Sequence, residues 1–359
     1  MMKKITELSK KEEERALELH QKFIFINGAE PSSLHCFDED FFKKIKESGM
    51  TAGSKMVALH ELRTEKYTRY GWDHGSIFRK IGDYFRFFAE YPDKTMLVTT
   101  VQDILRAKEE GKYGIILDLQ NPNPMGENIE LLSVFHKLGI RIIALCYSFR
   151  NALGDGCSEK GDAGLSNLGI EAVKEMNRLG IVIDLSHAGY KSTMEAIELS
   201  HDPVLFTHAN AYSIYPVARN KRDDQIKALA KKGGVIGCDG LAPTVRNVEG
   251  GPTIEDFLDH VDYIVKLVGV NHVGVGIDLP WHHTTTPELK EMLGKMYSSA
   301  YPISKSQLEL RGLTAKGLDS PALFPNVTKG LVARGYSDQE IEKILGGNFL
   351  RVFKAVWKG

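Results

Sequence analysis

The sequence predicts an α/β fold, a single (β/α)8 barrel domain spanning residues 1–359. Three observations lead to this prediction. Eight or nine short apolar runs are nearly continuous in their hydrophobicity, which is typical of parallel strands buried on both faces. Segments with helical periodicity lie between these runs, and several of them end at glycine, a frequent residue at helix C-termini. No change of composition marks a second domain, so a closed parallel barrel is favoured over an open sheet.

The predicted strands alternate with helical patterns along most of the chain. The strands are expected at residues 23–28, 56–62, 95–100, 113–120, 140–148, 180–187, 203–209, 234–240 and 272–279. The clearest helical patterns cover residues 126–139, 167–180, 192–200 and 223–234. We also expect a helical insertion near 71–93, after the second strand, and a long excursion near 281–326, after the last one.

The charge balance argues against partners that bind mainly through electrostatics. The chain has 46 Lys and Arg and 47 Asp and Glu residues, a net charge of −1, so we expect a small-molecule substrate and neither nucleic acid nor membrane. The N-terminus has no apolar signal segment and no run of about 18 apolar residues occurs, which predicts a cytoplasmic protein. Four cysteines without C-x-x-C spacing indicate reduced thiols.

Polar side chains stand at the ends of several predicted strands. Gln120, Tyr147, His187, His208 and Asp278 each end such a run. Because the C-terminal ends of barrel strands meet at one mouth, these side chains are expected to lie together. Imidazole and carboxylate groups are suitable ligands for zinc or a similar divalent ion. From the residues alone, a metal site and a set of hydrogen-bonded rim residues both remain open.

Four motifs together resemble the renal, or membrane, dipeptidase family. They are residues 173–187, ending in "DLSH", then 203–237, 272–278 with "HVGVGID", and 344–353 with "ILGGNFLRVF", and they follow the family's order. The resemblance covers most of the chain from about residue 113 onward. It implies a metal-dependent-hydrolase barrel of the TIM type, hydrolysis of dipeptides, and two zinc ions bridged by a glutamate. Members of this family often dimerise, so a homodimer is also implied.

The resemblance assigns roles to individual residues of this chain. His187 and His208 match the two imidazole ligands of one metal ion. Arg219, followed by Asn220 in the motif "ARNKRDD", matches the arginine that binds the substrate carboxylate, and both are expected to bind substrate. Asp278 matches the strand-end aspartate that is a ligand or an acid/base at the other metal.

The remaining family positions carry different residues in this chain. Ala29 and Pro31 stand where the family has a His and an Asp ligand, and neither side chain can bind a metal. Gln120 replaces the bridging glutamate and lacks its negative charge. Tyr147 replaces a histidine near the oxyanion, and with Asp278 it is a candidate catalytic residue.

These replacements predict a reduced metal site. A catalytic zinc usually has three protein ligands, and a bridging carboxylate supplies charge that keeps two dications close together. We therefore expect no binuclear zinc centre and at most one weakly held divalent ion, most simply zinc. Its ligands would be His187 and His208, with Gln120 or Asp278 and water completing the shell.

Two functions follow from this sequence. The first is a divergent dipeptidase-like amidohydrolase that acts on a dipeptide or small amide with a free carboxylate. The second is an inactive barrel that binds a small carboxylate ligand without activating water. Glu30 and Asp118 lie near the lost ligand positions and are possible replacements, although hydrogen bonding to a neighbour is the simpler expectation for each.

Overall fold

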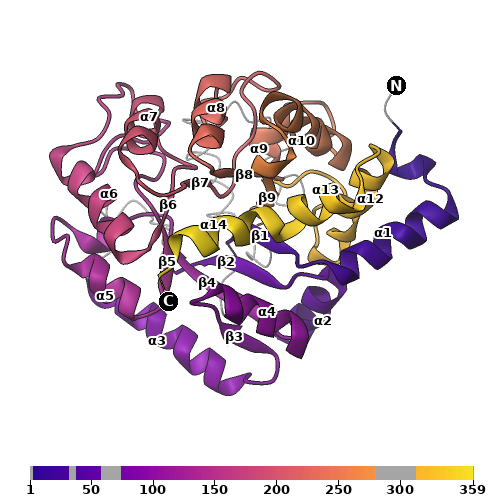
Figure 1. Cartoon of the computed structure of the whole chain (residues 1–359), viewed down its shortest axis with the longest axis horizontal. Helices are drawn as coiled ribbons and strands as arrows, with labels where there is room; N and C mark the ends of the chain where they lie inside the picture. Colours follow the sequence, from indigo (N-terminus) through magenta and orange to yellow (C-terminus); the bar gives the residue numbers. More distant parts are fainter. Residues whose placement is uncertain (1–2, 32–37, 58–73, 280–312, 359) are drawn as a thin grey trace.

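Nine strands occur in the part of the chain that the computed structural model describes, residues 3–31, 38–57, 74–279 and 313–358 (Figure 1). They are β1 Ile26–Glu30, β2 Ala52–Met56, β3 Thr95–Leu97, β4 Tyr113–Leu119, β5 Ile140–Ala144, β6 Val182–Asp184, β7 Leu205–Phe206, β8 Val235–Cys238 and β9 Val273–Val275. Helices surround these strands in the view of Figure 1.

The described helices follow the strands in the expected alternation. The α-helices are α1 Lys10–Lys22, α2 Glu39–Ser48, α3 His74–Glu90, α4 Val101–Glu110, α5 Leu131–Lys137, α6 Asn167–Leu179, α7 Tyr190–Leu199, α8 Asp223–Lys231, α9 Ala242–Val245, α10 Ile254–Val268, α12 Pro325–Ala333, α13 Asp338–Glu342 and α14 Asn348–Val356. Short 3-10 helices lie at η1 Ile5–Glu7, η3 Asn123–Met125, η4 Val270–His272 and η7 Pro321–Leu323, and a π-helix, η8, at Lys343–Gly347.

The sheet closes on itself. The strand order is β2-β1-β9-β8-β7-β6-β5-β4-β3, and β2 also pairs with β4. Every one of these pairings is parallel, so eight strands form a ring and β3 pairs beside the first residues of β4, outside it. The predicted (β/α)8 barrel is therefore confirmed.

Most predicted elements lie close to observed ones, and α3 lies within the segment 71–93, where a helical insertion was expected. The second strand is the exception, because it was expected at 56–62 and β2 lies at Ala52–Met56. Its sequence, AGSKM, consists mostly of small or polar residues. Gly53 leaves room for the Tyr113 hydroxyl, and Lys55 is buried in an ion pair with Glu30. Hydrophobicity does not select such a strand. Residues 58–62 and 280–312, which include most of the expected excursion, lie outside the described residues.

The barrel interior is apolar at one end and polar at the other. Its apolar layer consists of strand residues that pack against α14: Ile26, Ala52, Ile116, Ile142, Val182, Leu205 and Val235. Figure 1 shows α14, in yellow, lying across the strands. Side chains two positions further along a strand point to the same face. On β4 and β6 these are Asp118 and Asp184, so the polar layer lies toward the C-terminal ends of the strands.

Phe349 of α14 fills the apolar end of the barrel. It is 1% exposed, and glycines provide the space for its ring. A Cβ atom at Gly274 would lie 2.6 Å from Phe349 Cε2, and one at Gly28 or Gly237 would lie 3.0 or 3.2 Å from Phe349 Cζ. The C-terminal helix therefore acts as the plug of the barrel.

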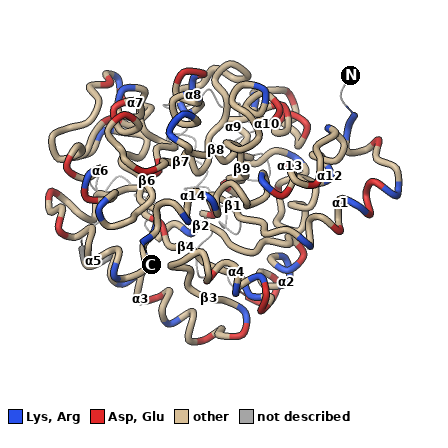
Figure 2. The backbone as a smooth tube through the Cα atoms, in the orientation of Figure 1, with Lys and Arg blue, Asp and Glu red and all other residues tan. Residues whose placement is uncertain are grey.

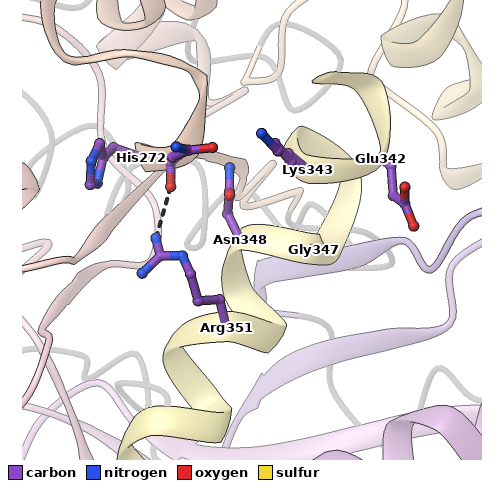
Figure 3. Close-up of a pocket in the computed structure, with 7 residues that line it drawn as sticks. His272, Glu342, Lys343, Gly347, Asn348 and Arg351 are labelled. Carbon is purple, nitrogen blue, oxygen red and sulfur yellow. Dashed lines mark hydrogen bonds between the residues drawn. The ribbon is translucent and has the colours of Figure 1, made fainter. Parts of the chain in front are cut away.

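A pocket of about 460 Å³ lies at this same end, beside the start of β9 (Figure 3). Lys343, Asn348 and Arg351 line it. Arg351 donates from Nη2 to the Asn271 carbonyl at 2.8 Å and from Nη1 to the Gly233 carbonyl at 2.7 Å. Its guanidinium thus joins α14 to the segments that enter β8 and β9, on the side of the barrel away from the predicted site.

Charges of both signs are interspersed over the helices in Figure 2, in agreement with the balanced composition. Among the described residues, no helix combines the length and the apolar character that crossing a membrane requires.

Replacing Phe349 by Ala should lower the free energy of unfolding by about 3–5 kcal/mol, because it removes a buried ring and leaves a cavity inside the barrel. Denaturant unfolding monitored by circular dichroism measures the change. Phe85→Ala is the matched control, since Phe85 is 41% exposed, and its effect should stay within about 0.5 kcal/mol. Equal effects of the two substitutions would contradict the assignment of Phe349 as the plug.

Candidate active site

The two histidines that end neighbouring strands meet at the polar end of the barrel. His187 follows β6 and His208 follows β7, and their Nε2 atoms are 3.0 Å apart. Both side chains are buried, with 5% and 0% of their surface exposed. Burial, together with the positive charges of Arg219 and Lys221, lowers the pKa of His208 well below its ordinary value, which keeps the ring neutral.

Gln120 and Tyr147 lie beside this pair. The Nε2 atom of Gln120, just after β4, is 3.3 Å from His208 Nε2. The Tyr147 ring, after β5, stacks on the His187 ring with 4.1 Å between centroids and 22° between planes. Four of the side chains singled out in the sequence therefore form a continuous chain of contacts, from Gln120 through the two histidines to Tyr147.

The Nδ1 atom of each histidine ring lies within hydrogen-bond distance of a hydroxyl group. Ser148 Oγ is 3.2 Å from His187 Nδ1, and Thr207 Oγ1 is 2.8 Å from His208 Nδ1. In metal sites such partners orient the ring and choose its tautomer. Sequence analysis missed both hydroxyls, and the only available signal was their position next to Tyr147 and His208.

Asp278 lies three residues beyond β9, with its backbone in the left-handed region at φ 52°. It is the one described residue other than glycine with positive φ, and its N–H donates to the Ala29 carbonyl at 3.2 Å. Desolvation raises the pKa of the Asp278 carboxyl well above its ordinary value, and the neighbouring Asp239 and Asp118 carboxylates add to the rise. Aspartate adopts the left-handed region more readily than most residues, and residues in such conformations often cluster at functional sites.

The two candidate replacement ligands have hydrogen-bond partners. Asp118 Oδ2 accepts from Ser54 Oγ, while Oδ1 is buried with no partner among the described residues. Burial raises the pKa of Asp118 to about 7. Glu30 is bound to Lys55 and to the Tyr113 hydroxyl, after a shift of register in β1 between Asn27 and Glu30. Glu30 thus belongs to a buried ion pair rather than to the histidine cluster.

The positions that the resemblance assigns to the family's first metal site have no ligand side chain. Ala29 is fully buried with an apolar side chain, and Pro31 follows it after β1. Over the described ranges, no group of three or more His, Cys, Asp and Glu side chains is placed to hold a metal ion. The paired imidazoles are therefore the feature of the site most suited to a cation.

Arg219 connects the two loops that carry the histidines. Its guanidinium is 1% exposed and donates to the Ser186 carbonyl and, at 2.6 Å, to the His208 carbonyl. The neighbouring Asn220 donates to the Tyr215 and Thr244 carbonyls at 2.8 Å each. Asn220 Oδ1 is buried and has no partner among the described residues. Arg219 thus lies against the histidine loops, whereas the hydrogen bonds of Asn220 run to the Tyr215 and Thr244 carbonyls.

Lys221 is a buried cation that the sequence analysis did not single out. It is 1% exposed, donates to the Ala188 carbonyl at 3.0 Å, and lies 5.0 Å from the centroid of the Phe206 ring. Burial is the main cause that lowers the pKa of Lys221 to about 7, and the positive charge of Arg219 adds to the effect. With Cys157 it lines a small cavity of about 190 Å³. The motif "RNKRDD" offered no sign that this lysine points inward.

Comparison with known proteins settles the family. The profile described as membrane dipeptidase, peptidase family M19, matches residues 15–293 and 309–358. The chain belongs to this family. The resemblance seen in the sequence is thus confirmed, and the paired histidines lie at the mouth of a membrane dipeptidase barrel.

Relatives of known sequence and structure agree with this assignment. Dipeptidase tcpJ of Claviceps purpurea is 27% identical over 284 residues, 78% of this chain and 59% of the relative. Dipeptidase verJ of Clonostachys rogersoniana is 29% identical over 270 residues, 74% of this chain and 61% of the relative. The chain therefore spans about three-fifths of the length of these relatives.

Solved structures show the same fold. An amidohydrolase from Pseudomonas aeruginosa superposes with a TM-score of 0.82 at 29% identity, covering 95% of this chain and 99% of the other. The probable dipeptidase PvdM from Pseudomonas aeruginosa has a TM-score of 0.80 at 20% identity, covering 98% and 99%. The second likeness concerns the fold alone.

Replacing Lys221 by Met should make this dipeptidase-family barrel more stable near neutral pH and less sensitive to pH. The folded-state pKa lies below the unfolded value, so the unfolded chain binds more protons between about pH 7 and 10 and stability rises with pH there. Below pH 7 the full penalty of the buried charge remains. Lys221→Met should therefore raise the free energy of unfolding at pH 7 by about 1–4 kcal/mol and flatten its rise up to pH 10.

Urea unfolding at pH 6, 7, 8.5 and 10 measures this slope. Lys227→Met on α8 is the control, because Lys227 is exposed and its removal should leave the pH dependence unchanged. A wild-type stability that does not rise between pH 7 and 10, or the same slope in Lys221→Met, would show that Lys221 is not a buried cation.

Proposed function

We propose that this protein is a dipeptidase-like amidohydrolase that cleaves a dipeptide or a small amide with a free carboxylate, using at most one metal ion. The single observation that carries the proposal is the pair of buried imidazoles with facing Nε2 atoms at the mouth of a membrane dipeptidase barrel. A small-molecule substrate agrees with the lack of a dominant charge.

His187 and His208 are the residues that would hold a single zinc ion. Zinc binds histidine nitrogen at about 2.0–2.1 Å, so two such ligands in tetrahedral geometry lie about 3.3–3.4 Å apart. The observed separation of 3.0 Å between His187 Nε2 and His208 Nε2 is within a few tenths of an ångström of that value. The Gln120 amide, 3.3 Å from His208 Nε2, is the nearest further donor group, because rotation of the amide exchanges its nitrogen and oxygen.

A second zinc ion does not fit the residues present. Ala29 and Pro31 have no donor atoms in their side chains, and the neutral amide of Gln120 cannot supply the charge of a bridging carboxylate. No step of the reaction is therefore assigned to a binuclear centre.

The remaining roles in the reaction belong to side chains of the protein. A bound zinc ion supplies a Lewis acid and lowers the pKa of water. Arg219 attracts the substrate carboxylate, since a guanidinium forms strong bidentate pairs with that group. Asn220 borders the same end of the substrate. Asp278 moves the proton between water and the leaving amine. Tyr147, whose phenol is neutral at pH 7, donates a hydrogen bond to the oxygen on which negative charge develops.

Elemental analysis of the purified full chain, supplied with zinc, should find at most one zinc ion per chain. Two imidazoles with a neutral amide hold a cation less firmly than a carboxylate-bridged pair, so a chelator should remove it readily. Hydrolysis of ordinary dipeptides should be correspondingly slow.

The triple variant Ala29→His, Pro31→Asp and Gln120→Glu is the matched comparison, because it restores the family's ligands. Its zinc content should rise toward two. Two zinc ions bound to the unaltered chain would refute the single-ion proposal.

Arg219→Ala should weaken binding of a dipeptide by about 10–100-fold, the loss expected for a charge-assisted hydrogen-bonded pair. The same dipeptide with an amidated C-terminus separates this role from the structural one, because Arg219 also holds the Ser186 and His208 carbonyls. The amidated ligand should lose far less affinity. Arg222→Ala, at an exposed neighbouring arginine, should affect neither ligand. Equal losses for both ligands in Arg219→Ala would leave Arg219 with its structural role alone.

A further inference from the structure

We infer that a chain of buried hydrogen bonds fixes the proton of the neutral His208 ring on Nδ1. The chain runs from Asp184 through the hydroxyl groups of Ser186 and Thr207. These three are positioning residues, because a proton on Nδ1 leaves the Nε2 atom of His208 with a free electron pair. The role of this relay in metal binding and catalysis rests on the proposed function. The proton positions themselves follow from hydrogen bonds among described residues and are measurable without any activity.

The anchor is the Oδ1 atom of Asp184 on β6. It accepts from the backbone N–H of Ser186 at 3.1 Å, the backbone N–H of Thr207 at 2.9 Å, and the Ser186 hydroxyl at 2.6 Å. Two of these donors are backbone amides, which can only donate, so this oxygen is an acceptor. The Ser186 hydroxyl, 0% exposed, therefore gives its single proton to Asp184.

The second link runs from Ser186 to Thr207. With its proton directed at Asp184, Ser186 Oγ can only accept in its other contacts. It accepts from the backbone N–H of His208 at 3.1 Å, and Thr207 Oγ1 lies 3.1 Å away. Unless the Thr207 hydroxyl donates to Ser186, two buried oxygens would be in contact with no hydrogen between them.

The third link reaches the imidazole. Thr207 Oγ1 has no further proton, and His208 Nδ1 is 2.8 Å from it. The nitrogen must therefore donate, which places the proton of the neutral ring on Nδ1. His208 Nε2 then has a free electron pair, which is the form that binds a metal or accepts a hydrogen bond. Thr207 and His208 are 3% and 0% exposed, so water offers no alternative partner from the surface.

The hydroxyl at His187 Nδ1 is not anchored in the same way among the described residues. Its Nδ1 faces Ser148 Oγ at 3.2 Å, and among the described residues Ser148 Oγ has no second partner. A hydroxyl group rotates, so it can donate to His187 Nδ1 or accept from it. With His208 Nε2 as an acceptor at 3.0 Å, His187 holds its proton on Nε2 in the metal-free protein.

The two histidines thus differ: the tautomer of His208 is fixed, whereas His187 can adopt either tautomer. When a cation takes the place of the hydrogen bond between the two rings, His208 is already in the required form. His187 moves its proton from Nε2 to Nδ1, where Ser148 accepts it, and no net charge is created. The contact between the rings therefore preserves a cation site in the absence of the cation.

The test is two-bond 1H–15N correlation NMR on chelator-treated full chain with 15N-labelled histidine, which distinguishes the two neutral tautomers. His208→Gln and His187→Gln assign the signals. We expect His208 as the Nδ1–H tautomer and His187 as the Nε2–H tautomer. An Nε2–H signal for His208 in the unaltered protein would overturn the inference, whatever the catalytic activity.

Variants of the relay sharpen the result. Thr207→Val, similar in shape, should shift His208 toward the Nε2–H tautomer and weaken zinc binding at least tenfold, while Thr207→Ser should restore both. Ser148→Ala should change the His187 signal and leave His208 unaltered. An unchanged His208 tautomer in folded Thr207→Val would also overturn the inference. If the tautomers are as inferred but neither zinc binding nor hydrolysis is found, the proposed function fails while the relay stands.

Discussion

Closure of eight parallel strands into a ring is the constraint on which the rest of this structure depends. Pairing of β2 with both β1 and β4 completes the ring and brings the C-terminal ends of all eight strands to one rim. Residues separated by 21 positions in sequence, His187 and His208, become neighbours because β6 pairs with β7. At the other end, the ring leaves a space that α14 closes with Phe349.

The polar end of the barrel is costly to fold, and it is organised so that most groups have partners. An unpaired polar group in such an interior costs about 1–3 kcal/mol. Asp184 accepts three hydrogen bonds, and Arg219 satisfies carbonyls on both histidine loops. Asp118 and Lys221 each have a hydrogen-bond partner as well, but burial moves the pKa of both groups toward 7. Such perturbed groups gather at functional sites.

The resemblance to the membrane dipeptidase family implies a retained half and an altered half of the site in this chain. The retained half is the loop pair after β6 and β7, where the imidazoles and Arg219 support one another through direct contacts. The altered half is the end of β1, where Ala29 is apolar and Glu30 is held by Lys55. Losing ligands at one strand leaves the other pair intact because each half is stabilised by its own hydrogen bonds.

Local pattern was enough to predict the barrel and the residues at its mouth. The apolar runs at β4 to β9 and the polar residues that end them are visible in the sequence because burial imposes hydrophobicity and strand ends interrupt it. The replacements at Ala29, Pro31 and Gln120 could also be read directly. Only the tertiary structure decided the course of β2, the ion pair of Glu30 with Lys55, and the burial of Lys221.

The hydroxyl relay likewise could not be predicted from the sequence. Asp184 and Thr207 are 23 positions apart, and serine and threonine are common enough that no local pattern marks them as partners of a histidine. The sequence by itself determined which residues stand at strand ends, because side-chain alternation and burial act over a few neighbouring residues. The tertiary structure decided which of those residues touch and where their protons lie, because hydrogen bonds between strands depend on register and on the closing of the ring.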